Sequence, residues 1–480
     1  IIVGAGFGGI AAAIELRKHG IDDITILEAA PGVGGTWFHN SYPGAACDVP
    51  SNLYSFSFAQ ETSWSAMCAP QSEILAYLEK VTREFGIAPL VRTGTRVTRC
   101  AFDDTARRWT VEIADGEPLQ ADAVIIATGQ LHQPALPKIP GIETFAGRAF
   151  HSAQWDHDYP LAGKRVAVVG TGASAVQFVP EIATEVAHLT VFQRSGNWFM
   201  PRLNRPYPGF YRWLIAHLPG LQPGLRVFWW HYGELLTRMI RSPERIGKLG
   251  RARSTRFMRR QIKDPALREQ LWPDYQFGCK RVLFSSRWLP ALQRPNVAVV
   301  TEAVTAVDQT GVIAADGAHH AVDCIIYGTG FRTTQFMFPM EIEGAGGASL
   351  RESWAGGAHA HLGMTIPGFP SLFVMYGPNT NTSGGSIVWY LEQQAGYIRQ
   401  ALELVRARAA AAIAVRPEVE IASDTATQAA FAGTAWLLCN SWYQTDTGRQ
   451  VTNWPLLMGD YRDAVQTLNP DDFELLEASA

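Results

Sequence analysis

Two stretches of the chain share one order of apolar and polar positions. Residues 1–30 pass from an apolar run through a glycine-rich turn into apolar residues at helical spacing, and end in a second apolar run, DITILEA. Residues 164–194 repeat this order, from KRVAVVGTGASA to LTVFQRS. An apolar run, a glycine turn and a helical repeat in succession are typical of a βαβ unit. The pattern therefore predicts two nucleotide-binding folds of the Rossmann type.

Two later apolar runs end in glycine and suit buried parallel strands that meet a ligand at their ends. They are AVIIATG at 123–129 and CIIYGTG at 324–330. Their positions predict that the second fold is inserted in the first. The polar tail from about 470 is expected to fray.

Between about 200 and 265 the pattern becomes aromatic, proline-punctuated and basic, with ten Lys/Arg against one acid from Arg238 to Lys263. This stretch is predicted to be a helical insertion. The favoured interpretation is a solvated face packed by aromatic side chains. A weak membrane-surface or partner contact through 200–265 is the alternative.

Composition limits the classes of function. A length of 480 residues suggests two or three domains, and 47% hydrophobic with 18% charged residues indicates a globular chain. The net charge of -3 provides no general attraction for nucleic acid. No apolar run is long enough to span a membrane and no secretion signal opens the chain, so we expect a cytoplasmic protein. The six cysteines form no C-x-x-C pair and no metal-like spacing with histidine, which disfavours zinc and dithiol chemistry.

The first glycine turn predicts a site for FAD or NAD(H). Gly4, Gly6 and Gly9 permit a tight turn, close approach of a pyrophosphate, and close packing of helix on strand. The N-terminus of the following helix stabilises the phosphate charge. At the end of the second strand Glu28 can accept both ribose hydroxyls and would repel a 2′-phosphate. The position of this turn at the start of the chain, followed by Gly35, Thr36 and Trp37, resembles flavoprotein monooxygenases, which implies that FAD occupies the first fold and that these residues belong to its site.

The second glycine turn predicts a site for NADPH. It reads Gly170-Thr171-Gly172-x-Ser174-Ala175, where alanine replaces the last glycine as often happens with NADP. The second strand ends in Arg194 and Ser195 instead of an acid. Arg194 can hold a 2′-phosphate bidentately, and no carboxylate repels it. Two sites of opposite ribose chemistry imply transfer of hydride from nicotinamide to flavin.

The segment that links the two folds resembles Baeyer–Villiger monooxygenases. It reads FAGRAFHSAQWD and satisfies that family's pattern F-x-G-x-x-x-H-x-x-x-W-[P/D] through Phe145, Gly147, His151, Trp155 and Asp156. A second family pattern matches GGTWFHNSYPGAACD, which ends at Asp48. The likeness extends through ATG, KR, RPNV, GTGF and SWY motifs over nearly the whole chain.

The resemblance implies an FAD- and NADPH-dependent monooxygenase that forms a peroxide at flavin C4a and inserts oxygen into a ketone, giving an ester or lactone. The abundant aromatic residues suggest that this is a small apolar ketone. It places Arg281 as the active-site arginine that stabilises the peroxide, with Asp48 as its partner. His151 is implied at the domain junction, where it would couple NADP binding to domain position, and Trp442 at the nicotinamide nucleotide. No metal is implied. Ala46 departs from the arginine that the best-known members carry, which leaves the balance of ketone and heteroatom oxidation open.

The sequence thus predicts an α/β fold with two Rossmann-like dinucleotide-binding domains, for FAD and NADP, the second inserted in the first. The expected division is an FAD-binding domain at 1–140, an NADP-binding domain at 141–320 and a second FAD-binding part with the C-terminal segment at 321–480. An N- or S-oxygenating flavin monooxygenase is the alternative enzyme. A non-catalytic flavoprotein sensor or membrane-associated adaptor is the alternative from another class. Oligomeric state stays open.

Overall fold

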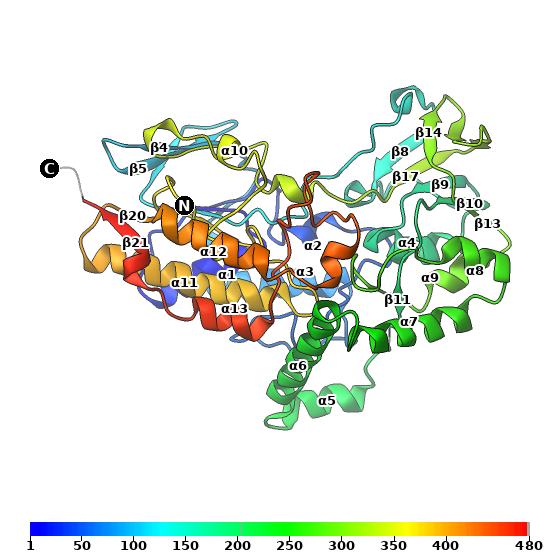
Figure 1. The fold of residues 1–480 in the computed structure, drawn as a ribbon, viewed down its shortest axis with the longest axis horizontal. Coiled ribbons are helices and arrows are strands. Elements are labelled where there is room, and N and C mark those ends of the chain that lie inside the picture. The colour runs from blue at the N-terminus through cyan, green and yellow to red at the C-terminus, as the bar shows by residue number, and fades with distance from the viewer. Residues whose placement is uncertain (203, 478–480) are drawn as a thin grey trace.

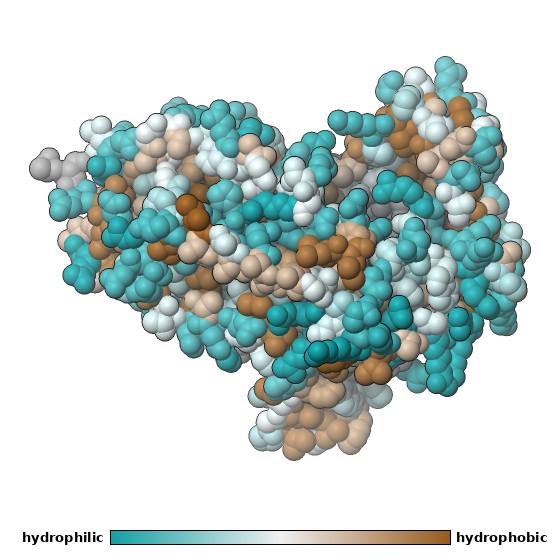
Figure 2. Space-filling view, viewed as in Figure 1, coloured by the Kyte–Doolittle hydropathy of each residue, from teal (hydrophilic) through white to brown (hydrophobic). Residues whose placement is uncertain are grey.

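Two lobes with a notch between them make up the molecule, and each lobe is built on a parallel sheet (Figures 1 and 2). The computed structural model describes residues 1–202 and 204–477. Both glycine turns lie between a strand and a helix, as the apolar pattern predicts.

The first sheet is built from both ends of the chain. Its five parallel strands follow the order β19-β7-β1-β2-β3. The bounds are β1 Ile2–Val3, β2 Ile26–Leu27, β3 Val91–Arg92, β7 Val124–Ile126 and β19 Leu372–Val374. Helix α1 (Phe7–Lys18) lies against α11 (Ile387–Ala407). Buried alanines at 11–13 let the two helices approach closely, because small side chains shorten the distance between helix axes.

The second sheet is built from the middle of the chain. Its parallel strands follow the order β13-β10-β9-β17-β8, covered by α4 (Ala173–Ile182) and α9 (Trp288–Ala291). The bounds are β8 Arg148–His151, β9 Arg165–Val169, β10 His188–Phe192, β13 Val297–Val300 and β17 Cys324–Tyr327. The chain enters this sheet after β7 and returns to the first sheet after β17, so the second fold is inserted in the first. β17 lies a few residues beyond the boundary expected at 320.

Smaller sheets and helices complete the two lobes. The mixed sheet β18-β4-β5-β6 comprises Glu341–Glu343, Val97–Asp103, Arg108–Ile113 and Leu119–Ala121. The antiparallel sheet β14-β15-β16 comprises Val304–Val307, Gly311–Ala314 and His319–Ala321, and β11 (Phe199–Met200) pairs with β12 (Leu283–Phe284). The remaining helices outside the insertion are α2 Thr36–His39, α3 Gln71–Glu84, α10 Leu350–Ser353, α12 Pro417–Ala429 and α13 Met458–Val465.

The aromatic and basic stretch is helical, as predicted. It forms α5 (Gly209–His217), α6 (Leu221–Arg241), α7 (Gly247–Gln261) and α8 (Pro265–Leu271). Helices α5 and α6 form a hairpin that projects from the underside of the molecule in Figure 1. Among the described residues no helix combines the length and the apolar content needed to cross a bilayer.

The expectation of a frayed tail from about 470 is wrong for residues 473–476. Strand β21 (Phe473–Leu476) pairs antiparallel with β20 (Ala412–Val415). Phe473 is buried in the core around α11, which gives this polar-looking segment an apolar anchor that the composition obscures. Residues 478–480 lie outside the described part of the chain.

Candidate active site

A cavity of about 1710 Å³ lies between the two parallel sheets and is lined by residues of both. A pocket for one drug-sized ligand usually measures about 300–1,000 Å³, so this cavity has room for more than one such group. Most of the residues singled out in the sequence line it: Gly4, Gly6, Glu28, Gly35, Thr36, Trp37, Asp48, Gly170, Thr171, Gly172, Ser174, Arg194, Ser195, Arg281 and Trp442. Gly9, Ala175 and His151 lie behind this lining.

The first glycine turn is shaped by backbone contacts that a side chain would block. Gly4 has φ +106°, and a Cβ there would lie 2.6 Å from the Ala127 carbonyl oxygen. A Cβ on Gly9 would lie 1.9 Å from the Gly4 carbonyl oxygen. Gly35 folds over this turn, since its Cβ would lie 3.0 Å from the Gly6 Cα. The turn therefore leaves an open cradle at the N-terminus of α1, which suits a pyrophosphate.

Glu28 closes the ribose end of this cradle. Its carboxylate accepts hydrogen bonds from the N–H groups of Ala5 at 2.7 Å and Ala30 at 2.8 Å. The side chain is 7% exposed and lines the cavity. These two bonds hold the carboxylate in place and leave further acceptor positions for ribose hydroxyls. The fixed negative charge disfavours a 2′-phosphate at this end.

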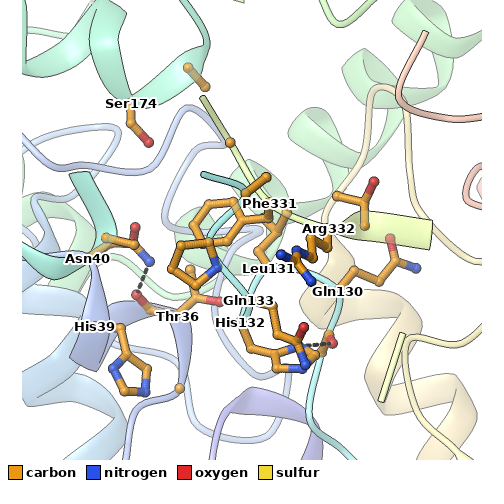
Figure 3. Close-up of a pocket in the computed structure, with 18 of the residues that line it drawn as sticks. Thr36, His39, Asn40, Gln130, Leu131, His132, Gln133, Ser174, Phe331 and Arg332 are labelled. Atoms are coloured by element: carbon orange, nitrogen blue, oxygen red, sulfur yellow. Dashed lines mark hydrogen bonds between the residues drawn. The ribbon is translucent and has the colours of Figure 1, made fainter. Parts of the chain in front are cut away.

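The segment after Gly35 adds an aromatic wall. Trp37 is buried, and its indole N–H donates to the Tyr54 hydroxyl at 3.1 Å. Asn40 is tied to the Thr36 carbonyl at 2.9 Å, which closes the short helix α2 (Figure 3). Trp37 and Tyr54 both line the cavity.

The second glycine turn repeats the backbone geometry of the first. Gly170 has φ +102°, and a Cβ there would lie 2.6 Å from the Gly328 carbonyl oxygen. Ala175 is fully buried, with its methyl group 3.2 Å from the position of a Cβ on Gly328. The site therefore accommodates alanine in place of the third glycine. Gly172 caps α4, and the N-terminus of this helix opens toward the cavity.

Two cations approach each other beyond β10. Arg194 is exposed at the cavity wall next to Ser195. Lys280 also lines the cavity, with its ammonium 4.4 Å from the centre of the Tyr275 ring. Burial lowers the pKa of Lys280; the negative charge of Asp274 acts in the opposite direction, and the positive charge of Arg194 lowers the pKa again. Cations that repel each other in the absence of a ligand form a site for a phosphate dianion. The sequence pattern identifies Lys280 only as part of the KR motif and does not predict this contact with the NADPH site.

Arg281 and Asp48 form an ion pair across the two halves of the cavity wall. The Arg281 Nη2 donates to both carboxylate oxygens of Asp48, at 2.8 and 2.7 Å. Burial raises the pKa of Asp48, but the charge and hydrogen bonds of Arg281 outweigh burial and hold it below its usual value. The negative charge of Asp48 raises the pKa of Arg281 in turn. The arginine side chain keeps 36% exposure, so the guanidinium also faces the cavity that it lines.

Two tyrosines lie near this ion pair, Tyr443 buried and Tyr376 half-buried. Burial raises the pKa of Tyr443 to about 12, although the charge of Arg281 acts in the opposite direction. The same two influences act on Tyr376, whose pKa is also raised. The Tyr376 hydroxyl donates to Asn381 at 2.7 Å. Both tyrosines therefore stay neutral near Arg281, and they were missed in the sequence because only folding brings them there.

Trp442 lies beside Tyr443 at the cavity surface and is 41% exposed. The two rings have centroids 4.2 Å apart. Thr333 donates its hydroxyl proton to the Trp442 carbonyl at 3.1 Å, which ties this C-terminal loop to the chain after β17. The indole ring is thus held at the cavity but remains free to contact a ligand.

His151 is buried at the end of β8 and does not line the cavity. Its Nδ1 accepts from the N–H of Ala153 at 3.1 Å, which assigns the proton of the neutral ring to Nε2. Burial lowers the pKa of this ring. His151 packs edge-to-face against Phe331, with ring centroids 5.8 Å apart. It therefore supports the cavity wall from behind, at the point where the chain passes between the sheets.

The chain crosses between the sheets twice, and the two crossings are hydrogen-bonded to each other. The N–H of Ala135 donates to the Gly330 carbonyl at 2.9 Å, and the N–H of Arg332 donates to the Gln133 carbonyl at 3.0 Å. Figure 3 shows Leu131, His132, Gln133, Phe331 and Arg332 together in the cavity. The signal that could have found them is their position directly after the ATG and GTG strand ends.

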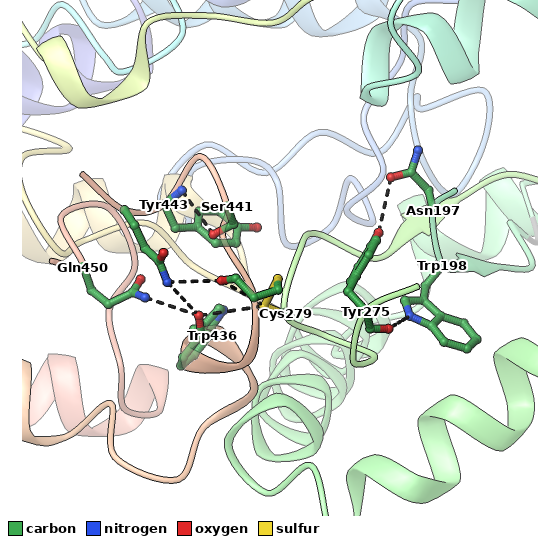
Figure 4. Close-up of a disulfide and its surroundings, with 10 residues drawn as sticks. Asn197, Trp198, Tyr275, Cys279, Trp436, Ser441, Tyr443 and Gln450 are labelled. Carbon is green, nitrogen blue, oxygen red and sulfur yellow. Dashed lines mark hydrogen bonds between the residues drawn. A yellow bond between two sulfur atoms is a disulfide. The ribbon is translucent and has the colours of Figure 1, made fainter. Parts of the chain in front are cut away.

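A disulfide joins Cys279 to Cys439 beside this site, at a sequence separation of 160 (Figure 4). The spacing of the cysteines gave no hint of it, because only folding brings the two segments together. Cys279 precedes the cationic pair Lys280 and Arg281, and Cys439 precedes the loop of Trp442. The disulfide thus connects the segment that carries the cations to the C-terminal loop. The other four cysteines are buried and free.

Comparison with known proteins agrees with this architecture. A family model described as pyridine nucleotide-disulphide oxidoreductase matches residues 1–205, which hold both glycine turns. The chain is 42% identical to a Baeyer-Villiger monooxygenase of Streptomyces coelicolor, over 99% of this chain and 92% of that protein.

Solved structures show the same likeness in space. An oxidized steroid monooxygenase bound to NADP matches with a TM-score of 0.89 and 31% identity, over 99% of this chain and 98% of that one. A crystal structure of OTEMO in complex with FAD and NADP matches with a TM-score of 0.89 and 26% identity, over 99% and 98% of the two chains.

Proposed function

The chain belongs to the Baeyer–Villiger monooxygenase family, and from this premise we propose that Arg281 and Asp48 support the insertion of oxygen into a ketone at the cavity between its two sheets. The protein is an FAD- and NADPH-dependent monooxygenase. One oxygen atom of O₂ enters the ketone to form an ester or lactone, and the other leaves as water with the two electrons of NADPH.

The residues present fit both cofactors, and we assign each to one glycine turn. FAD takes the turn of Gly4, because the open cradle at α1 suits a pyrophosphate and Glu28 suits an unmodified ribose. NADPH takes the turn of Gly170, because Arg194 and Lys280 together supply the positive charge that a 2′-phosphate requires. In this assignment the boundaries between the domains lie close to the two chain crossings near Gln133 and Arg332, and the NADP-binding domain is inserted in the FAD-binding domain.

When bound, the flavin supplies the activation of oxygen and NADPH supplies the hydride. The role of the protein is to place a positive charge next to the oxygen atom on which negative charge develops during attack on the carbonyl. Arg281 meets this need, because Asp48 fixes its Nη2 while the side chain still faces the cavity. The shared cavity with a fixed guanidinium is the single observation on which the proposal depends.

The cavity also bears on the substrate. Apolar side chains line it among the polar cofactor contacts, including Leu131, Phe331, Met340, Ile387 and Leu391. An apolar lining favours a small apolar ketone. Cytoplasmic location stays a prediction, which cell fractionation would test, and sedimentation of the purified protein would give its oligomeric state.

The experiment is turnover of the purified holoenzyme with NADPH and a cyclic ketone under ¹⁸O₂. We expect a lactone that carries one labelled oxygen atom and a matching consumption of NADPH. A thioether is offered in parallel. Labelled sulfoxide without lactone would replace the proposal by heteroatom oxygenation. If neither lactone nor sulfoxide forms, and NADPH consumption does not depend on substrate, the proposed oxygenation is refuted and the protein is a flavoprotein without this activity.

A further inference from the structure

Exposed large apolar side chains gather on the helical insertion. Of the thirteen such side chains found in the described part of the chain, eight fall between residues 210 and 249. They are Phe210, Trp213, Leu218, Val227, Phe228, Leu235, Ile246 and Leu249. Figure 2 shows the hairpin of α5 and α6 as an apolar projection beneath a largely polar surface. Monomeric proteins seldom expose contiguous apolar surface of this kind without a use for it.

Helix α6 turns two of its charged side chains, Arg226 and Glu234, toward the body and several apolar side chains toward solvent. Arg226 donates to Glu392 at 3.1 Å and to the carbonyl of Ser55 at 2.8 Å, and its side chain is only 14% exposed. Glu234 is 3% exposed and accepts from the N–H of Met458 at 2.6 Å, at the N-terminus of α13. In contrast, Phe228 between them is 57% exposed. The hairpin is therefore anchored to the body by polar contacts while its apolar face meets solvent.

Basic residues surround the projection. Residues 201–263 contain fourteen Lys/Arg and two Glu, in a chain whose net charge is -3. One of the two acids is the buried Glu234, and the other, Glu244, lies 3.5 Å from Lys248. On α7 the side chains of Arg251, Arg253 and Arg256 are all exposed. Positive charge is thus concentrated in the region that carries the apolar face.

We propose that this surface docks on an anionic lipid bilayer. The hairpin inserts Phe210, Trp213 and Phe228 among the headgroups, and the arginines of α7 face the lipid phosphates. Aromatic side chains with flanking Lys/Arg are the composition of helices that lie in a membrane interface. The hairpin projects from the body, and a protein partner would need a concave surface of complementary shape to cover it. A fluid bilayer accommodates such a projection without a complementary shape.

The test is cosedimentation of the purified holoenzyme with vesicles of phosphatidylcholine, alone or mixed with phosphatidylserine. We expect binding to the mixed vesicles, much weaker binding to phosphatidylcholine alone, and a loss of binding as salt rises. The measurement needs no turnover, so it stands apart from the proposed oxygenation.

Variants with matched controls locate the contact. F210S/W213S removes two exposed aromatic side chains of α5, and R253Q/R256Q removes two exposed charges of α7. We expect each arginine to contribute about fivefold to the partition coefficient, so that the second variant binds about 25-fold more weakly to the mixed vesicles. The controls are I421S, at an apolar side chain 61% exposed on α12, and R408Q, at an exposed arginine after α11.

Each result decides the question. Weak binding by the two hairpin variants and normal binding by the controls supports the proposal. Equal binding to both vesicle types, absence of binding, or equal losses in the controls overturns it. A dimer that F210S/W213S dissociates, in a protein that ignores vesicles, also overturns it and assigns the surface to a second copy of the chain.

Discussion

Replacing Arg281 by alanine should abolish ester formation while leaving the reduction of the flavin by NADPH intact. The guanidinium is held by two hydrogen bonds of 2.8 and 2.7 Å to Asp48, so it needs little reorganisation when charge develops on oxygen. Loss of one such preorganised donor costs about 2.7–4 kcal/mol, or about 10²–10³ in rate. R281K keeps the charge but not the planar fork that grips Asp48, so we expect an intermediate loss.

The assay separates the two half-reactions. Anaerobic mixing with NADPH measures the rate of flavin reduction by absorbance, and aerobic turnover measures ester, NADPH and hydrogen peroxide together. For R281A we expect reduction close to the wild-type rate, little ester, and peroxide in its place. R165A is the matched control, because Arg165 pairs with Asp323 at the surface, where its side chain is 50% exposed.

Stability must be measured beside activity, since R281A leaves the Asp48 carboxylate without its partner. Burial, which raises the pKa of Asp48, is then opposed only by the charge of Arg202 and a backbone hydrogen bond. Loss of a fully buried partner costs about 3–5 kcal/mol, but the exposure of Arg281 reduces this to about 1–2 kcal/mol. D48N/R281A should recover that stability and still make no ester. Wild-type ester formation by R281A, or recovery of ester in the double variant, would refute the role given to Arg281.

Three further predictions test the cofactor sites and the pH dependence of folding. R194A should raise the KM for NADPH about 10–100-fold and leave that for NADH nearly unchanged, as steady-state kinetics with both nucleotides would show; equal effects on both would contradict the 2′-phosphate contact. G9A should lose flavin from the purified protein, because its Cβ would lie 1.9 Å from a carbonyl oxygen, whereas G396A, at a helical position with nothing within 4 Å, should retain it. The hydrogen bond with Glu420 raises the pKa of His359, so this pair stabilises the fold below the ordinary histidine pKa of about 6.5 and the gain is lost as pH rises through the folded value. Denaturant unfolding at about pH 6 and about pH 9 should therefore show a smaller difference for E420Q than for the wild type, and an unchanged difference would exclude the pair as its source.

The glycine turns could be predicted from the sequence because their requirements are local. Gly4 and Gly170 each adopt a positive φ, and Gly9 lies against the carbonyl of Gly4 within the same turn, so the glycines recur at a fixed spacing in the chain. The insertion of one fold in the other could likewise be inferred, since strand patterns recur in order. The domain boundaries themselves stay predictions, and so do the roles of the individual site residues.

Contacts between distant segments could not be predicted in this way. Lys280 approaches Arg194 only when the segment after α8 folds back on the second sheet, and no spacing encodes that. The outward apolar face of α6 was also hidden, because aromatic residues at helical spacing usually pack inward. The burial of Arg226 and Glu234, together with the exposure of Val227, Phe228 and Leu235, shows which face of this helix meets solvent.

The bond between Cys279 and Cys439 has a mechanical consequence for the inserted fold. Its two chain crossings are hydrogen-bonded to each other near Gln133 and Arg332, and the Arg281–Asp48 ion pair also joins the two sides of the cavity without a covalent bond. Such noncovalent contacts can open and re-form as the two lobes move, whereas the covalent bond between Cys279 and Cys439 limits how far the segments that it joins can separate. Thiol reagents that open this bond would therefore widen the range of motion between the lobes while every cofactor-contacting side chain stays the same.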